Sequence, residues 1–109
     1  MSKDSNDKCI FCGIARGSKE KILEDFEDFV IFNDIRPSAP FHMLLVPKEH
    51  IPSINELEEQ HKDLVAQMIF AARDIAKVNN MEGYKLCFNV GEKGGQVVKH
   101  LHLHLLGWQ

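Results

Sequence analysis

Three histidines near the end of the chain alternate with leucines. His100, His102 and His104 are separated by Leu101 and Leu103, which is the polar and apolar alternation of a β-strand. Successive side chains of a strand point to opposite faces, so three imidazoles are expected on one face, about 6.6 Å apart at a rise of roughly 3.3 Å per residue. Imidazole is a nucleophile when neutral and an acid when protonated. The segment predicts histidine chemistry, and three solvated or hydrogen-bonded side chains are the alternative.

A glycine-rich turn precedes this segment. Gly91, Gly94 and Gly95 lie five to nine residues before the first of these histidines. Glycine-rich backbone can direct several N–H groups at one anion. An anion-binding loop beside imidazoles favours phosphoryl or nucleotidyl transfer, in which one histidine attacks phosphorus while its neighbours position the phosphate and stabilise its charge.

Hydrophobic periodicity predicts the elements that hold these residues. A short helix is expected over 9–16 and a long amphipathic helix over 55–79, with Ser53 or Asn55 as its N-cap. Strands are expected over 21–24, 29–33, 42–46, 84–90 and 97–106. Because the strands are joined locally and do not alternate with helices, the order predicts an α+β fold with a mostly antiparallel sheet of about five strands. His61, among polar residues of the long helix, is expected to be solvated.

Composition limits the possible classes of function. The chain has 109 residues, of which 44% are hydrophobic, so residues 9–109 are expected to form one domain after a flexible tail over 1–8. A net charge of −3 gives no cationic surface for a nucleic acid polymer. The polar start and the lack of a run of about 18 apolar residues predict a soluble, cytoplasmic protein without a membrane contact, with the nucleus as a further possible location.

The cysteines predict a metal site more strongly than a disulfide. The three cysteines are an odd number, and Cys9 and Cys12 have the CxxC spacing of half a tetrahedral zinc site. Two imidazoles would complete a Cys₂His₂ set. The alternative is that both thiols are buried as small hydrophobic groups, which is also what we expect of Cys87.

Several short motifs, in this order along the chain, resemble those of the histidine triad (HIT) superfamily, and specifically its small Hint-like branch. The resemblance extends from Cys9 to Gly107 and rests on the segments 9–12, 32–35, 39–42, 46–50 and 94–96, on Asn89 and on the alternating histidines. It implies a homodimer that binds a purine mononucleotide such as AMP beside the histidine strand.

The resemblance also assigns roles to individual residues. His102 resembles the nucleophile that attacks the α-phosphate of a nucleoside 5′-phosphoramidate of the adenylyl-amine type and forms a covalent nucleotidyl-histidine. His104 would hydrogen-bond the phosphate or the leaving group, His42 would join the histidine relay, and Asp34 would accept a ribose hydroxyl. The expected purine-pocket walls are Phe11, Ile14, Phe32, Ile35 and Leu44, and the expected phosphate-side residues are Asn89, Gly95, Gln96 and Val97. From the residues alone, Phe11, Ile14, Phe32 and Leu44 are each expected to be core rather than pocket, and Asp34 could equally be a turn residue.

The metal ligands follow from the same resemblance. Members with this CxxC motif imply His50 and His100 as the partners of Cys9 and Cys12 in a structural zinc site. Such a closed site would leave His102 free for chemistry, which would need no cofactor.

Two features of the chain differ from the Hint pattern. Val97 follows Gly-Gly-Gln where that pattern has a small hydroxyl residue, so weaker activity or a different leaving-group preference is expected. The sequence ends at Gln109, short of the tail with which some relatives reach the partner's site, and Trp108 could substitute for that tail. Three alternatives stay open: a dinucleoside polyphosphate hydrolase of the Fhit type, a nucleotide-binding or scaffold module with weak catalysis, and a metal-handling protein that uses all three triad histidines as ligands.

Overall fold

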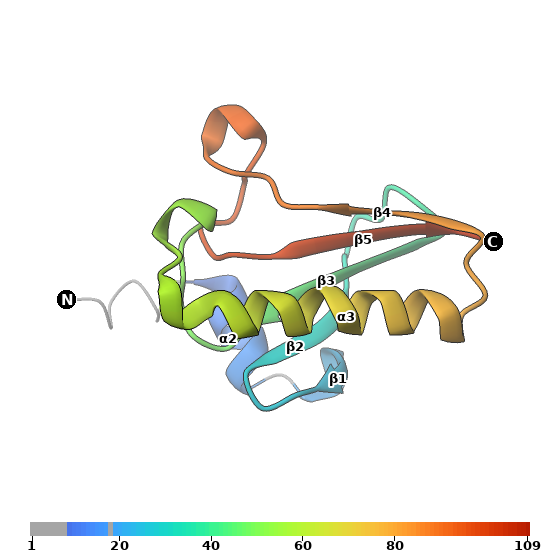
Figure 1. The fold of residues 1–109 in the computed structure, drawn as a ribbon, viewed down its shortest axis with the longest axis horizontal. Helices are drawn as coiled ribbons and strands as arrows, with labels where there is room; N and C mark the ends of the chain where they lie inside the picture. Colours follow the sequence, from blue (N-terminus) through green and yellow to red (C-terminus); the bar gives the residue numbers. More distant parts are fainter. Residues whose placement is uncertain (1–8, 18) are drawn as a thin grey trace.

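The computed structural model describes residues 9–17 and 19–109 (Figure 1), so the tail predicted over 1–8 lies outside the described residues. Five strands form one sheet in the order β1-β2-β3-β5-β4, and every neighbouring pair is antiparallel. The strands are β1 (Ile22–Asp25), β2 (Phe29–Asn33), β3 (Phe41–Pro47), β4 (Gly83–Cys87) and β5 (Leu103–Trp108). The helices are α2 (Ile10–Gly17) and α3 (Lys62–Val78). The predicted α+β fold is confirmed.

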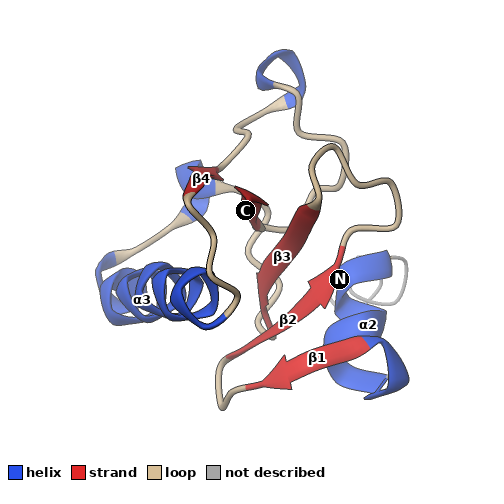
Figure 2. Cartoon of the chain, turned by 90° about the vertical axis from the view of Figure 1, so that its right-hand side faces the viewer, coloured by secondary structure: helices blue, strands red, loops and turns tan. Residues whose placement is uncertain are grey.

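The two helices lie on opposite faces of the sheet (Figure 2). Strands β2 and β3 are apolar at nearly every position and bury side chains on both faces. On the α3 face the core consists of Phe29, Ile31, Met43, Leu45, Met68, Ala72, Leu103 and Leu105. On the α2 face it consists of Phe11, Ala15, Val30, Phe32, Leu44 and Val46. Because His104 pairs with Leu44 in the sheet, its imidazole shares the α2 face.

The histidine strand begins later than its sequence pattern predicts. Residues 97–102 are irregular, and β5 begins only at Leu103. The neighbouring strand β3 ends at Pro47, which has no N–H to continue the ladder. The N–H of Leu101 instead donates to the carbonyl of Ile51, at 2.6 Å. The alternation of Leu101, Leu103 and Leu105 as buried residues nevertheless continues through the irregular segment.

The long helix also begins later than expected, at Lys62. Two short 3₁₀ turns, Ile54–Glu56 and Glu59–His61, occupy the first part of the predicted range. Ser53 caps the first of these turns, where its hydroxyl accepts from the N–H of Asn55. Leu57, with ψ of 144°, is extended and separates the two turns. The helical pattern of apolar residues therefore begins before the α-helix itself.

The other boundaries agree with the sequence to within a few residues. The end of α3 is as predicted, with Asn80 in the left-handed region at φ of 55°. Strand β4 ends at Cys87 and not at Val90. No helix in the described part of the chain has both the length and the apolar character needed to cross a membrane.

Candidate active site

Three imidazoles converge on the α2 face, but they are not the three that alternate along the sequence. The ring of His104 lies 4.8 Å from that of His102 and 5.2 Å from that of His42, centroid to centroid. His42 comes from β3, two residues before Leu44, which pairs with His104. His100 turns away toward His50, with ring centroids 5.0 Å apart. The catalytic and metal predictions thus separate in space as the resemblance implies.

Hydrogen bonds assign the tautomer of each converging imidazole. The N–H of Ser38 donates to Nδ1 of His42 at 3.0 Å, so the His42 proton is on Nε2. That Nε2–H donates to Nδ1 of His104 at 2.9 Å, which places the His104 proton on its own Nε2. Nδ1 of His102 donates to the carbonyl of His100 at 2.7 Å, which leaves a lone pair on the His102 Nε2. The site therefore offers one imidazole lone pair beside one N–H donor.

The Nε2 atom of His104 is buried and has no hydrogen-bond partner among the described residues. A buried donor without a partner costs about 1–3 kcal/mol, and such groups are rare outside functional sites. An oxygen of a bound anion would satisfy it.

Burial keeps the imidazoles of His102 and His104 neutral. Desolvation lowers the pKa of His104 to about 4, helped by the neighbouring His102 and His42, while the Asp34 carboxylate opposes the shift. Desolvation also lowers the pKa of His102, although its bond to the His100 carbonyl and the Asp34 charge act in the opposite direction. The His102 lone pair is thus available at neutral pH.

Asp34 forms a turn and also contacts His42. One carboxylate oxygen accepts from the N–H of Arg36 at 2.8 Å, which is the turn arrangement that the sequence left open. The other oxygen lies 3.4 Å from Nε2 of His42. The carboxylate is partly exposed beside the imidazoles.

The expected purine-pocket residues fall into two groups. Phe11, Phe32 and Leu44 are buried in the core under α2, and Ile14 packs against them. The rings of Phe11 and His102 pack nearly perpendicular to each other, with centroids 4.9 Å apart. Ile35 differs from all four, because 85% of it is exposed.

The glycine-rich loop is held by Gln96. Its amide nitrogen donates to the carbonyls of Pro52 and Val98, at 2.6 and 3.0 Å, and its amide oxygen accepts from the N–H of Gly91 at 2.9 Å. Both amide hydrogens are therefore used within the protein, so Gln96 can serve a phosphate only by shaping the loop. Gly95, at φ of 91°, lies against the side chain of Asn89. Val97 projects outward with 90% of its surface exposed.

The cysteine motif forms a four-residue cluster with two histidines. The ligand atoms of Cys9, Cys12, His50 and His100 all lie within 4.8 Å of one another. Sγ of Cys12 is 3.1 Å from Nδ1 of His50 and 3.3 Å from Nδ1 of His100. These separations fit a tetrahedral zinc ion, whose ligands lie at about 2.0–2.3 Å. Nε2 of His100 donates to the carbonyl of Pro47 at 2.8 Å, which leaves its Nδ1 lone pair for the metal.

A second group of possible ligands is unsuited to a metal. Asp34, His42 and His104 also bring their ligand atoms within 4.8 Å of one another. Nδ1 of His42, however, accepts from the N–H of Ser38. If a metal bound Nε2 of His42, the neutral ring would carry its proton on Nδ1. That proton would then face the N–H of Ser38, and the hydrogen bond between them would be lost. The chemistry of this group therefore favours proton and phosphate contacts, and the four-residue cluster favours zinc.

The comparisons with known proteins agree with this geometry. The family model described as "Scavenger mRNA decapping enzyme C-term binding" matches residues 8–109. The chain is 41% identical over 104 residues to Protein HitA of Neisseria gonorrhoeae, with 93% of this chain and 96% of that protein covered. The chain belongs to the histidine triad family.

Two further histidine triad relatives have names that describe an activity. Purine nucleoside phosphoramidase of Escherichia coli K12 is 36% identical over 104 residues, with 93% of this chain and 87% of that protein covered. Adenosine 5′-monophosphoramidase HINT3 of Danio rerio is 44% identical over 109 residues, with 94% of this chain and 67% of that protein covered.

Solved structures of histidine triad proteins have the same fold. A HIT family hydrolase from Legionella pneumophila superposes with a TM-score of 0.87 at 40% identity, with 94% of each chain covered. A zinc-bound histidine triad protein from Mycobacterium smegmatis superposes with a TM-score of 0.80 at 27% identity, with 95% of this chain and 77% of that chain covered.

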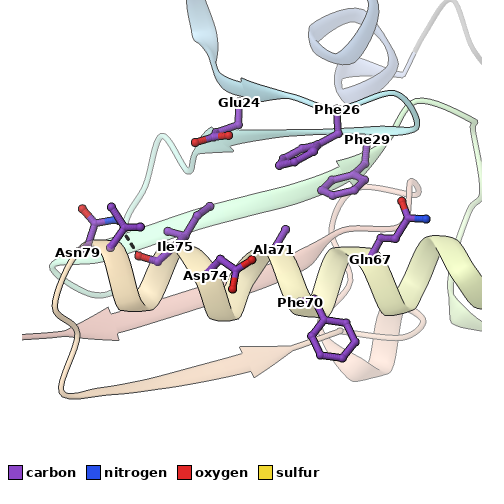
Figure 3. A pocket seen from close by; sticks show the side chains of 10 residues that line it. Glu24, Phe26, Phe29, Gln67, Phe70, Ala71, Asp74, Ile75 and Asn79 are labelled. Atoms are coloured by element: carbon purple, nitrogen blue, oxygen red, sulfur yellow. Dashed lines mark hydrogen bonds between the residues drawn. The ribbon is translucent and has the colours of Figure 1, made fainter.

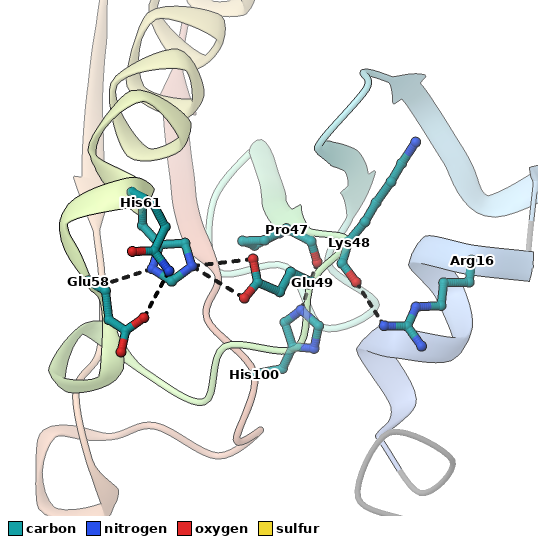
Figure 4. Close-up of polar contacts among 8 residues, drawn as sticks. Arg16, Pro47, Lys48, Glu49, Glu58, His61 and His100 are labelled. Atoms are coloured by element: carbon teal, nitrogen blue, oxygen red, sulfur yellow. Dashed lines mark hydrogen bonds and ion pairs between the residues drawn. The ribbon is translucent and has the colours of Figure 1, made fainter. Parts of the chain in front are cut away.

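Sequence reasoning was wrong about His61 in this histidine triad chain. Only 7% of His61 is exposed, and Figure 4 shows its imidazole between two partners. Nδ1 accepts from the N–H of Glu58 at 2.9 Å, and Nε2 lies 3.2 Å from the carboxylate of Glu49. His61 thus links the loop after β3 to the start of α3. Its partners are a backbone group and a residue 12 positions away, which no local pattern reveals.

Ser38 contacts the candidate site in a way that the sequence did not indicate. It fixes the tautomer of His42 through its backbone N–H, a group that every residue except proline carries. The only local signal is its position between Pro37 and Pro40, which marks a rigid loop.

Proposed function

We propose that the protein hydrolyses purine nucleoside 5′-phosphoramidates at the α-phosphate through a covalent nucleotidyl-histidine on His102. The observation that carries the proposal is the hydrogen bond from Nδ1 of His102 to the His100 carbonyl, which leaves the lone pair on Nε2, the ring nitrogen farther from the backbone. The relatives named purine nucleoside phosphoramidase and adenosine 5′-monophosphoramidase support the substrate class.

The reaction proceeds in two displacements at phosphorus. Nε2 of His102 forms a bond to phosphorus while the P–N bond to the amine breaks, and the leaving nitrogen takes up a proton from solvent. Water then forms a P–O bond as the P–Nε2 bond breaks, and a proton returns to solvent. The products are a nucleoside 5′-monophosphate and a free amine. The buried Nε2–H of His104 donates to a non-bridging oxygen in both steps.

His42 acts as a positioning residue in this scheme. Its Nε2–H donates to Nδ1 of His104 and thereby keeps the His104 proton on the side of the phosphate. Asp34, 3.4 Å from the same Nε2, would accept a ribose hydroxyl with its exposed edge. Phe11 and Ile14 would contact the base.

Zinc would be structural in this protein. Cys9, Cys12, His50 and His100 would hold it, and it would join α2 to the segment before β5. The carbonyl that orients His102 belongs to His100, so the metal would also fix the position of the nucleophile.

We also propose that the active form is a homodimer joined at the β4 edge. Strand β4 is a sheet edge with no further neighbour among the described strands, and its residues 83–86 are exposed. Tyr84 and Leu86 present exposed apolar side chains there, and Ile69 adds another from α3. Size-exclusion chromatography with light scattering tests this, since a monomer at micromolar concentration would contradict it.

Turnover of matched substrates tests the proposed activity. Adenosine 5′-phosphoramidate and a diadenosine polyphosphate would be incubated with the zinc-loaded protein, with His102→Ala as the inactive control. We expect release of AMP from the phosphoramidate, and loss of this release in the variant. Faster cleavage of the diadenosine compound would favour a polyphosphate hydrolase. Nucleotide binding without turnover of either compound would favour a binding module.

A further inference from the structure

A groove lies between α3 and the hairpin of β1 and β2, on the face of the sheet opposite the imidazoles. It has a cavity of about 540 Å³, within the range of about 300–1,000 Å³ typical of small-molecule sites. Figure 3 shows Phe26 and Phe29 from the hairpin above the groove, with Asp74 and Ile75 on α3 below it. We call this cavity the α3 groove.

The apolar part of the α3 groove is aromatic. The rings of Phe26 and Phe29 stack with centroids 4.5 Å apart and an interplanar angle of 15°. Phe29 is buried in the core, whereas 37% of Phe26 is exposed. Ala71 and Ile75 continue the apolar surface along the helix. A partly exposed stacked pair offers a ring surface to a ligand.

The charged part of the α3 groove is entirely acidic. Its lining residues include two carboxylates, Glu24 and Asp74, and no lysine, arginine or histidine. A cation placed against an aromatic ring and a carboxylate is stabilised by both. Arg73, just outside the lining, shows this chemistry at the rim. Its guanidinium lies 4.8 Å from the centroid of the Phe70 ring and 3.1 Å from the Asp74 carboxylate.

The α3 groove is separate from the edge proposed for the homodimer. At 100° per residue, Ile69 lies about 140° around α3 from Asp74, which lines the groove. A partner at the β4 edge would therefore leave the groove open.

We propose that the α3 groove binds a small organic cation, an ammonium or guanidinium carried on an aromatic or aliphatic body. The apolar body would lie on Phe26, and the charged end would reach Glu24 and Asp74. Charge complementarity selects this class over a neutral or anionic ligand, since no lining side chain could neutralise an anion. The site does not depend on the proposed hydrolase activity, because it lies across the sheet from the imidazoles.

A matched pair of ligands tests the contribution of the charge. The zinc-loaded, ¹⁵N-labelled protein would be titrated with phenethylamine and with 2-phenylethanol, which share the same ring and chain length, in the presence of AMP to occupy the nucleotide site. We expect shifts of the amide signals of residues 24–29 and 67–79. The association constant of the amine should be roughly threefold to tenfold higher than that of the alcohol, as expected for two partly screened charges. Salt at 0.5 M should reduce this difference.

Charge variants test whether the carboxylates of the α3 groove cause the preference for the amine. The double variant Glu24→Gln/Asp74→Asn should remove the preference for the amine, whereas Glu27→Gln/Glu59→Gln, with the same change in charge outside the groove, should keep it. Arg73→Gln should strengthen amine binding because it frees the Asp74 carboxylate.

Four outcomes would overturn the proposal. These are equal affinity for amine and alcohol, shifts confined to residues 89–104, no shifts at about 10 mM ligand, and loss of an oligomer on Phe70→Ser, which would assign the groove to a second copy of the chain. The first three outcomes would leave the expected turnover of adenosine 5′-phosphoramidate unchanged, and for the fourth the turnover is measured on the wild type, so this proposal and the proposed function fail separately.

Discussion

Removal of the proposed zinc should destabilise the protein strongly, and the third cysteine, Cys87, provides the control. Cys12 is buried and lies within 3.3 Å of both His50 and His100, so its replacement by serine should destroy the site. Without a metal, burial and the neighbouring Cys9 raise the pKa of the Cys12 thiol to about 11. The apo cluster therefore holds a neutral thiol beside neutral imidazoles, and only weak contacts replace the metal bonds.

The expected loss of stability follows from the linkage between metal binding and folding. A metal that binds only the folded state adds about 2.7 kcal/mol to the free energy of unfolding when its free concentration is about 100 times its dissociation constant. For a domain of this length, 1 kcal/mol corresponds to roughly 4–8 °C in the melting temperature. Stripping zinc from the wild type should thus lower Tm by about 10–20 °C.

Thermal unfolding with and without a chelator measures this directly. The wild type should respond to the chelator and recover on addition of zinc, and Cys12→Ser should not respond. Cys87→Ser should respond like the wild type, because Cys87 lies outside the cluster and donates to Asn89 instead. An unchanged wild-type Tm in chelator, or a chelator response in Cys12→Ser equal to that of the wild type, would refute the assignment of the ligands.

Three other perturbations have expected outcomes. The pKa of His104 falls to about 4 on folding, so the stability that it contributes is present above the unfolded pKa of about 6.5 and is lost as the pH falls toward 4. Urea unfolding should lose about 2 kcal/mol between pH 7 and pH 5 from this group, and His104→Gln should reduce that loss. His61→Ala should lower the free energy of unfolding by about 1–3 kcal/mol, because it leaves the Glu58 N–H without its partner; equal stability of the variant in urea would contradict this role. Val97→Ser should raise kcat/KM for a phosphoramidate roughly twofold to tenfold if a hydroxyl there assists the leaving amine, and an equal rise in Val97→Ala would assign the effect to side-chain size.

The sequence was most informative where the structure depends on local patterns. Strands β2 and β3 are apolar runs that end at Asn33 and Pro47, and their boundaries agree with the sequence prediction to within one residue. The left-handed Asn80 likewise marks the end of α3. In these segments the local pattern of apolar and turn-forming residues coincides with the final boundaries of the elements.

Predictions failed where distant contacts override the local pattern. The alternation around His100 predicts a strand, but Pro47 and Ile51 take up hydrogen bonds that would otherwise continue the ladder. The apolar periodicity near Leu57 predicts a helix, but Leu57 is extended, and His61 contacts Glu49 across 12 positions in the short turn before Lys62. Neither partner can be inferred from spacing along the chain.

The site shows the same division. The CxxC spacing indicates a metal from two residues only, and its completion by His50 and His100 depends on pairing across the sheet. The tautomer of His42 depends on a backbone N–H, which has no signature in the sequence. The residue types could therefore be predicted, but the direction of each proton could not.

The most direct test of the account is the covalent intermediate. The zinc-loaded protein would be mixed with adenosine 5′-phosphoramidate, quenched within milliseconds and digested for mass spectrometry. We expect an added AMP group on the peptide that contains His102, located on that residue by fragmentation, and none in His102→Ala. An adduct on His104 or on another residue, or full turnover by His102→Ala, would contradict the assignment of the His102 lone pair as the nucleophile.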